Sequence, residues 1–162
     1  MATFRSSTHV AAAPERVFEV FTDLGKAAQR IESITALEIL TPGPVGLGTR
    51  WRETRVMFKR ESSEEMEITA FDPPRGYSVG AMSCGVLYDT RFDFTPEGDG
   101  TRVEWIFKGT PQTFGAKLTA PIFGLFFGGM LKKCMRADLE ALRAACEGQE
   151  SAAGVSDAAA PA

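Results

Sequence analysis

Apolar and polar residues alternate along much of the chain up to residue 109, with the period of two that is typical of half-buried β-strands. The alternation is clearest over residues 88–94 and 103–107, where one face is aromatic and the other is charged. Turn signals rich in glycine and proline separate the segments, as in an antiparallel meander. The predicted strands cover residues 4–10, 34–40, 49–58, 64–71, 77–83, 86–95 and 101–109.

The pattern changes to helical spacing in three places. Apolar residues recur at helical intervals over positions 17–21, directly after Pro14, which suits a first helical turn. Residues 26–31 can form a second short helix. A long C-terminal helix is predicted from about residue 115 to residue 146, with Thr119 as its N-cap ahead of Pro121.

This last helix contains an unusually apolar run over residues 121–131. The run ends at two lysines after about half of the roughly 20 apolar residues that a membrane span needs, so we expect it to cover the aromatic face of the sheet. Each glycine inside it costs up to about 1 kcal/mol relative to alanine. Close packing against the sheet and open volume for a ligand are two ways to compensate for these residues, which are Gly124, Gly128 and Gly129.

The composition is that of one globular domain: 162 residues, 44% apolar and 24% charged. We expect an α+β domain over residues 1–147, in which a curved seven-stranded antiparallel sheet and two short helices accompany the long helix. A disordered tail rich in alanine, glycine, serine and proline is expected over residues 148–162. The net charge of −3 gives no basic field for a nucleic acid partner.

The N-terminus lacks the charged and apolar regions of a secretory signal, so a cytoplasmic location is expected. Three widely spaced cysteines fit reduced thiols better than a disulfide framework. With a single histidine and no Cys-x-x-Cys pair, neither a metal site nor a tightly bound cofactor is expected.

Four segments, residues 10–23, 45–50, 71–75 and 100–105, resemble in order and spacing the polyketide cyclase/dehydrase branch of the START-like (SRPBCC) superfamily. The resemblance covers roughly residues 3–146 and implies the helix-grip fold of the birch-pollen allergen, with a deep apolar cavity between the sheet and the long helix. Members bind lipids, sterols, polyketides or other hydrophobic molecules. Some catalyse aromatic cyclisation or dehydration, and others stimulate a heat-shock ATPase, so the fold does not decide the function.

Rings of the sheet and apolar side chains of the long helix are expected to line this cavity. The alternative is that they simply fill the core, since periodicity does not separate lining from packing. The candidate ligand-binding residues are Trp51, Arg55, Met57, Tyr88, Phe92, Phe94, Trp105, Phe107, Phe123, Phe127, Met130 and Cys134.

The strand over residues 49–58 carries charge on both faces. Trp51, Glu53, Arg55 and Met57 share one side, and the sequence alone leaves open which side faces inward. One hypothesis is a Glu53–Arg55 pair that orients a ligand carboxylate or carbonyl, because a buried arginine needs an acidic partner. The alternative is an exposed ladder of cross-strand salt bridges.

Tyr88 is a candidate hydrogen-bond donor or general acid inside the cavity, together with Arg55 and Glu53, although a lone tyrosine on an aromatic face also fits core packing. Three functions therefore remain open. They are binding of a small hydrophobic ligand, cyclisation or dehydration of a polyketide-like substrate in the same cavity, and docking of a membrane surface or protein through the apolar front near Phe126.

Overall fold

The structure, a computed structural model, describes the backbone of residues 1–57 and 59–148, and their side chains except those of residues 119–127. The predicted tail, beyond Gly148, lies outside the described residues. The elements in chain order are β1 (Ala2–Val10), α1 (Pro14–Thr22), the 3-10 helix η1 (Leu24–Lys26), α2 (Ala27–Arg30), β2 (Ile34–Ile39), β3 (Arg50–Met57), β4 (Arg60–Asp72), β5 (Gly76–Ser83), β6 (Val86–Glu97), β7 (Gly100–Pro111) and α3 (Phe114–Cys146).

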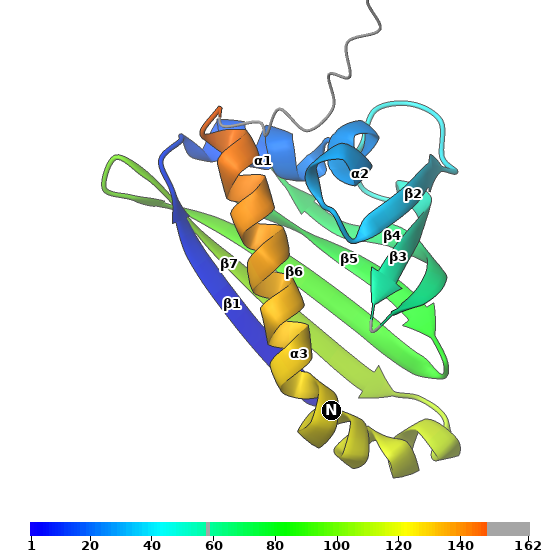
Figure 1. Cartoon of the computed structure of the whole chain (residues 1–162). Coiled ribbons are helices and arrows are strands. Elements are labelled where there is room, and N and C mark those ends of the chain that lie inside the picture. The colour runs from blue at the N-terminus through cyan, green and yellow to red at the C-terminus, as the bar shows by residue number, and fades with distance from the viewer. Residues whose placement is uncertain (58, 149–162) are drawn as a thin grey trace, which may run out of the picture.

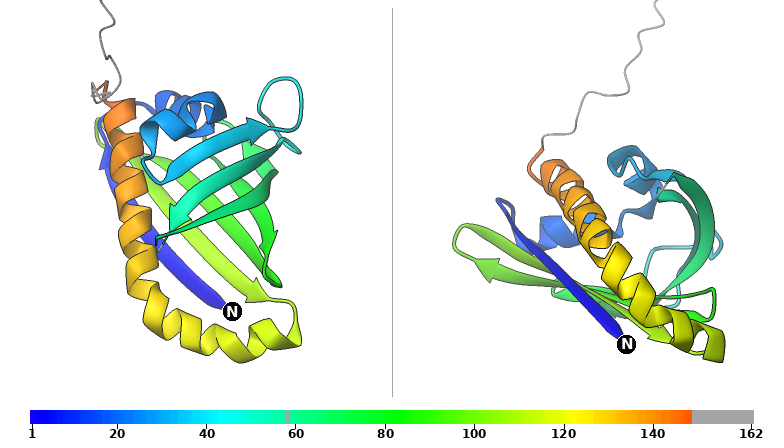
Figure 2. Two further views of the ribbon diagram at one scale, coloured as in Figure 1. Left: turned by 45° about the vertical axis from the view of Figure 1, so that its right-hand side comes forward. Right: turned by 60° about the horizontal axis from the view of Figure 1, so that its bottom comes forward.

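All the strands form one antiparallel sheet in the order β1-β7-β6-β5-β4-β3-β2. β2 to β7 make a meander, and β1 adds itself beside β7, so the first and last strands are neighbours. The sheet curves around α3, which crosses its concave face (Figures 1 and 2). The predicted α+β architecture, with its seven strands, short helices and long C-terminal helix, is confirmed.

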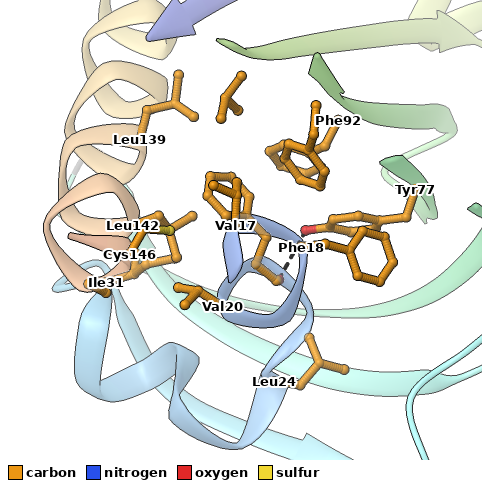
Figure 3. Close-up of a cluster of buried hydrophobic side chains, with 14 of the residues drawn as sticks. Val17, Phe18, Val20, Leu24, Ile31, Tyr77, Phe92, Leu139, Leu142 and Cys146 are labelled. Atoms are coloured by element: carbon orange, nitrogen blue, oxygen red, sulfur yellow. Dashed lines mark hydrogen bonds between the residues drawn. The ribbon is translucent and has the colours of Figure 1, made fainter. Parts of the chain in front are cut away.

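The core lies where α1 and the C-terminal half of α3 meet the sheet (Figure 3). Apolar residues on one side of α1 are buried, as their helical spacing predicts. The ring of Phe21 lies 5.7 Å from that of Phe92 and 5.1 Å from that of Phe94, and Phe18 lies 6.0 Å from Phe94. Part of the aromatic face of the sheet is therefore covered by α1.

The long helix begins at Phe114, because Thr113 is its N-cap and the Thr113 side chain accepts a hydrogen bond from the backbone N–H of Ala116. The predicted N-cap at Thr119 is therefore wrong, and Pro121 lies inside the helix. A proline there removes a helical N–H and bends the helix. Figure 2 shows such a bend, since the first turns of α3 run along the end of the sheet before the rest crosses it.

Gly128 provides close approach between α3 and the edge strand β1. A Cβ at this position would lie 3.0 Å from Cε1 of Phe4, whereas a Cβ at Gly129 would meet nothing within 4 Å. Close packing thus accounts for one of the three helix glycines, and Gly124 falls where side-chain surroundings are not described. Among the described residues, no helix is both long enough and apolar enough to span a membrane.

Candidate functional site

The inner face of β3 carries Trp51, Glu53, Arg55 and Met57. Trp51 and Glu53 are only 3% and 5% exposed, whereas Arg52 on the other face is exposed. Trp51 decides the orientation, because its large ring belongs to the buried core cluster. The side of β3 that faces α3 therefore brings an arginine and a glutamate into the interior.

A small cavity of about 50 Å³ opens beside these residues on β3 and β4. Its volume is that of one or two water molecules, far below the roughly 300–1,000 Å³ of pockets that enclose a drug-sized ligand. It therefore accommodates one functional group of a ligand. The lining residues are Glu53, Arg55, Met57, Ser62, Glu64 and Met66.

Arg55 is the centre of a hydrogen-bonded network that joins β3 to α3. Its Nε donates to Glu53 Oε1 in a short ion pair, and its Nη1 donates to Asp138 Oδ2 at 2.6 Å and to Ser33 Oγ at 3.2 Å. The indole of Trp51 donates to the other oxygen of Glu53 at 3.2 Å. These contacts hold the guanidinium in one orientation beside the cavity.

The network carries more negative than positive charge. Burial alone would lower the pKa of Arg55, but the carboxylates of Glu53 and Asp138 raise it overall, so the guanidinium stays protonated. Burial raises the pKa of Asp138, and Arg55 opposes this rise without cancelling it. Two carboxyl groups, those of Glu53 and Asp138, therefore contact one guanidinium, and a third, that of Glu64, lies on the cavity wall.

Arg55 retains donors that the protein does not use. Among the residues that the structure describes, neither Nη2 hydrogen has a hydrogen-bond partner, and the side chain is 24% exposed. Arginine carries five N–H donors in a fixed fork. Two of them are therefore available to a group in the adjoining cavity.

Tyr88 lies on the same concave face, on β6. Burial raises the pKa of its hydroxyl, and the charges of Glu64 and Cys84 add to the effect, so the hydroxyl remains a hydrogen-bond donor. The same Glu64 lines the cavity beside Arg55. The ring of Tyr88 also packs against that of Phe107, with centroids 5.5 Å apart. The geometry therefore fits a packing role for Tyr88 as well as a role as a donor.

The other residues predicted to line the cavity differ in how deeply they are buried. Phe92 and Phe94 are 7% and 3% exposed and pack within the core, and the ring of Trp105 packs at a tilt against that of Phe92 with centroids 5.1 Å apart. Met130 is 49% exposed, and Cys134 is partly buried. The remaining aromatic candidates on the helix, Phe123 and Phe127, lie outside the described side chains, as does Phe126 of the docking hypothesis.

Two interior residues were missed at the sequence level. Asp138 carries the α3 end of the Arg55 network, and its only signal was an acid next to the apolar Leu139 on the buried stripe. Tyr77 is buried, stacks on Phe92 at 5.0 Å and donates its hydroxyl to the backbone oxygen of Phe21 at 3.1 Å (Figure 3). Burial raises the Tyr77 pKa far above its usual value, so this residue serves as a protonated structural donor.

Within residues 1–57 and 59–148, no three metal-ligating side chains come together. The groups around Arg55 supply hydrogen-bond donors, and the neighbouring carboxyl groups can accept or release a proton.

Comparison with known proteins bears on the fold and the family. The model of the family "Polyketide cyclase / dehydrase and lipid transport" matches residues 1–147. No curated protein matches the chain. Among solved structures, the ZhuI aromatase/cyclase from Streptomyces sp. R1128 is 18% identical with a TM-score of 0.77, covering 94% of this chain and 98% of that one.

Two further structures support the same fold. Ara h 8.0201 is 16% identical with a TM-score of 0.70, covering 91% of this chain and 98% of that chain. TTHA0849 from Thermus thermophilus is 24% identical with a TM-score of 0.68, covering 94% of this chain and 99% of that chain. These likenesses establish the helix-grip fold, and the match over residues 1–147 shows that the chain belongs to the polyketide cyclase/dehydrase and lipid transport family.

Proposed function

We propose that this protein binds a small, uncharged hydrophobic molecule whose oxygen accepts hydrogen bonds from Arg55. The observation that carries the proposal is the pair of Nη2 donors, which have no partner among the described residues and belong to a side chain that lines the cavity. These donors are open to solvent, so a ketone, ester or hydroxyl oxygen of a ligand can replace water as their acceptor. The aromatic residues of the concave face supply the apolar surroundings.

The charge of the site argues for an uncharged ligand. Glu53 and Asp138 contact the one guanidinium, and Glu64 lines the same cavity, so a ligand carboxylate would enter a region with surplus negative charge. Of the two acceptors considered for the Glu53–Arg55 pair, the carbonyl is therefore favoured over the carboxylate. The raised pKa of Asp138 has the same physical origin, because burial and the neighbouring Glu53 both disfavour its ionised form.

Two fluorescent probes of the same shape test this proposal. One is the neutral ketone 6-propionyl-2-(dimethylamino)naphthalene, and the other is 6-(dimethylamino)-2-naphthoate, which carries a carboxylate instead. We expect the ketone to bind about 10-fold more tightly, which corresponds to roughly 1.4 kcal/mol. Absence of binding by either probe would contradict the ligand-binding proposal, and a preference for the carboxylate would contradict the proposed selectivity.

A matched pair of variants shows whether the inner carboxyl groups cause the preference. Asp138→Asn removes a carboxylate beside Arg55, and Glu65→Gln makes the same change in net charge on the exposed outer face. Asp138→Asn should narrow the gap between the two probes, and Glu65→Gln should leave it unchanged. Equal effects of the two variants would mean that overall charge, rather than the site, sets the preference.

A second candidate is cyclisation or dehydration of a polyketide-like substrate in the same site. It is favoured by the Tyr88 hydroxyl, which stays protonated near Glu64, and by the fold shared with an aromatase/cyclase. Tyr88→Phe should then abolish turnover of a linear poly-β-ketone substrate while the neutral ketone probe still binds. Unchanged turnover in this variant would exclude Tyr88 as the proton donor.

A further inference from the structure

The two tryptophans of the concave face differ in how their indole N–H groups are satisfied. Trp51 donates to Glu53 Oε2 at 3.2 Å. Trp105 Nε1 is inaccessible to solvent and has no hydrogen-bond partner in the part of the chain that is described. Buried side-chain donors in folded proteins almost always have a partner, so the Trp105 indole calls for an acceptor that the described residues do not provide.

The sheet around Trp105 is mostly apolar. On β7 the next inward positions are Val103 and Phe107, and on β6 the paired residue is Phe92. On β1 the paired residue is Ser6, but no hydrogen bond joins its hydroxyl to the indole. The backbone groups of this central strand are used in the ladders with β1 and β6. The indole N–H is thus a polar group held in apolar surroundings, which costs free energy unless an acceptor is supplied from outside.

We propose that Trp105 donates a hydrogen bond to a second oxygen of the bound ligand. The inference rests on the proposed function, in which Arg55 holds the first oxygen. It adds the chemical class of the ligand: an uncharged, elongated hydrophobe with acceptor oxygens toward both ends, rather than a hydrocarbon chain with a single head group.

The topology sets the length of such a ligand. β3 and β7 are separated by β4, β5 and β6, so four strand spacings of about 4.8 Å lie between Arg55 and Trp105 along the sheet. The sheet is curved and both side chains reach inward, which shortens the gap that the ligand spans. A molecule with two or more fused rings and a ketone at each end fits this arrangement.

The experiment uses two matched probes, 2,6-diacetylnaphthalene and 2-acetyl-6-ethylnaphthalene, which differ by one ketone. The chain contains only two tryptophans, so a ¹H–¹⁵N correlation spectrum shows two indole signals, which the variant Trp105→Phe assigns. We expect the diketone to move the Trp105 signal downfield. The Trp51 signal is the internal control for the comparison of the two probes: it should lie at the same position in both complexes, because its N–H is bonded to Glu53 and the probes differ only at the end that reaches Trp105.

Affinities provide the second readout. The diketone should bind wild-type protein about 5–10-fold more tightly than the monoketone, and the two should bind Trp105→Phe equally, because phenylalanine keeps an apolar ring and lacks the donor. Binding of both probes with an unmoved Trp105 signal would overturn this inference and leave the proposed function intact. Failure of both probes to bind would instead contradict the proposed function itself.

Discussion

The two faces of β3 carry arginine–carboxylate networks that differ in burial and in reach. On the outer face, Arg52 donates to Glu38 and Glu65 at 2.9 Å each, and these three side chains are between 45% and 66% exposed. On the inner face, Arg55 pairs with Glu53 and Asp138, whose side chains are 6% and 7% exposed. The sequence suggested either an interior Glu53–Arg55 pair or an exposed ladder of salt bridges on this strand. The structure has the pair on the inner face and the ladder on the outer face.

The difference shows that environment, rather than residue type, decides what such a network does. Outer pairs are surrounded by water and screened by salt, so they add little to stability. The inner network is partly desolvated, and each charge there depends on its partners. It also joins β3 to α3 across 83 positions of sequence, so it ties the helix to the strand that lines the cavity.

The two faces of β3 should differ most in how much stability the protein loses when the arginine of each network is replaced. Arg55→Met should lower the free energy of unfolding at pH 7 by about 3–5 kcal/mol, because two partly buried carboxylates lose their cationic partner. Urea unfolding measures this change. Arg52→Met is the matched control on the outer face and should shift the urea midpoint far less. Equal losses in the two variants would show that burial does not separate the two networks.

The second prediction concerns the pH dependence of stability. The contribution of Asp138 on the inner face should fall as the pH rises, whereas that of Glu65 on the outer face should fall as the pH drops. Burial raises the Asp138 pKa, so the folded state holds this proton more tightly than the unfolded chain does. The Asp138 contribution to stability is therefore fully present below its ordinary pKa of 3.8 and is lost as the pH rises through the raised value. Hydrogen bonding to Arg52 lowers the pKa of Glu65, whose contribution is present above 4.5 and is lost as the pH falls through the lowered value.

Denaturant unfolding of wild type, Asp138→Asn and Glu65→Gln between pH 3.5 and pH 8 tests these signs. From pH 4 to pH 7, the stability of wild type relative to Asp138→Asn should fall, because the folded state holds the Asp138 proton to a higher pH than the unfolded chain does. Relative to Glu65→Gln, wild type should lose stability only toward the acid end. Parallel pH profiles for both variants would contradict the assigned shifts.

Local patterns predicted the sheet well because strand alternation depends only on neighbouring residues. Where partners extend a strand, the boundaries moved: β4 begins at Arg60, four positions before the predicted start, since the polar residues there still pair with β3. The predicted start of α3 near residue 115 lies one position from the observed Phe114, but its N-cap was misplaced for a similar reason. The backbone N–H groups of Gln112 and Thr113 bond to Gly85 O in the β5–β6 turn, which fixes Thr113 as the N-cap through a contact remote in sequence.

The site was partly predictable for the same physical reason. The proximity of Glu53 and Arg55 follows from alternation along one strand, but their orientation does not, because both faces of β3 carry arginine. Asp138 lies on a different element, so only the fold brings it to Arg55. The packing of α1 on Phe92 and Phe94 could not be predicted either. The sequence patterns of α1 and β6 show that each has an apolar face, but they do not show which two faces meet.

The smallest expected effect is that of salt on the outer network. At 1 M NaCl the Debye length is about 3 Å, so the exposed pairs of Arg52 are screened while the desolvated pairs of Arg55 are much less affected. The stability difference between wild type and Arg52→Met should therefore disappear between 0.05 M and 1 M NaCl, and that of Arg55→Met should persist. Urea midpoints at each salt concentration give both differences. If the Arg55→Met difference also disappeared, water would have to reach the inner network, and the two faces of β3 would be electrostatically alike.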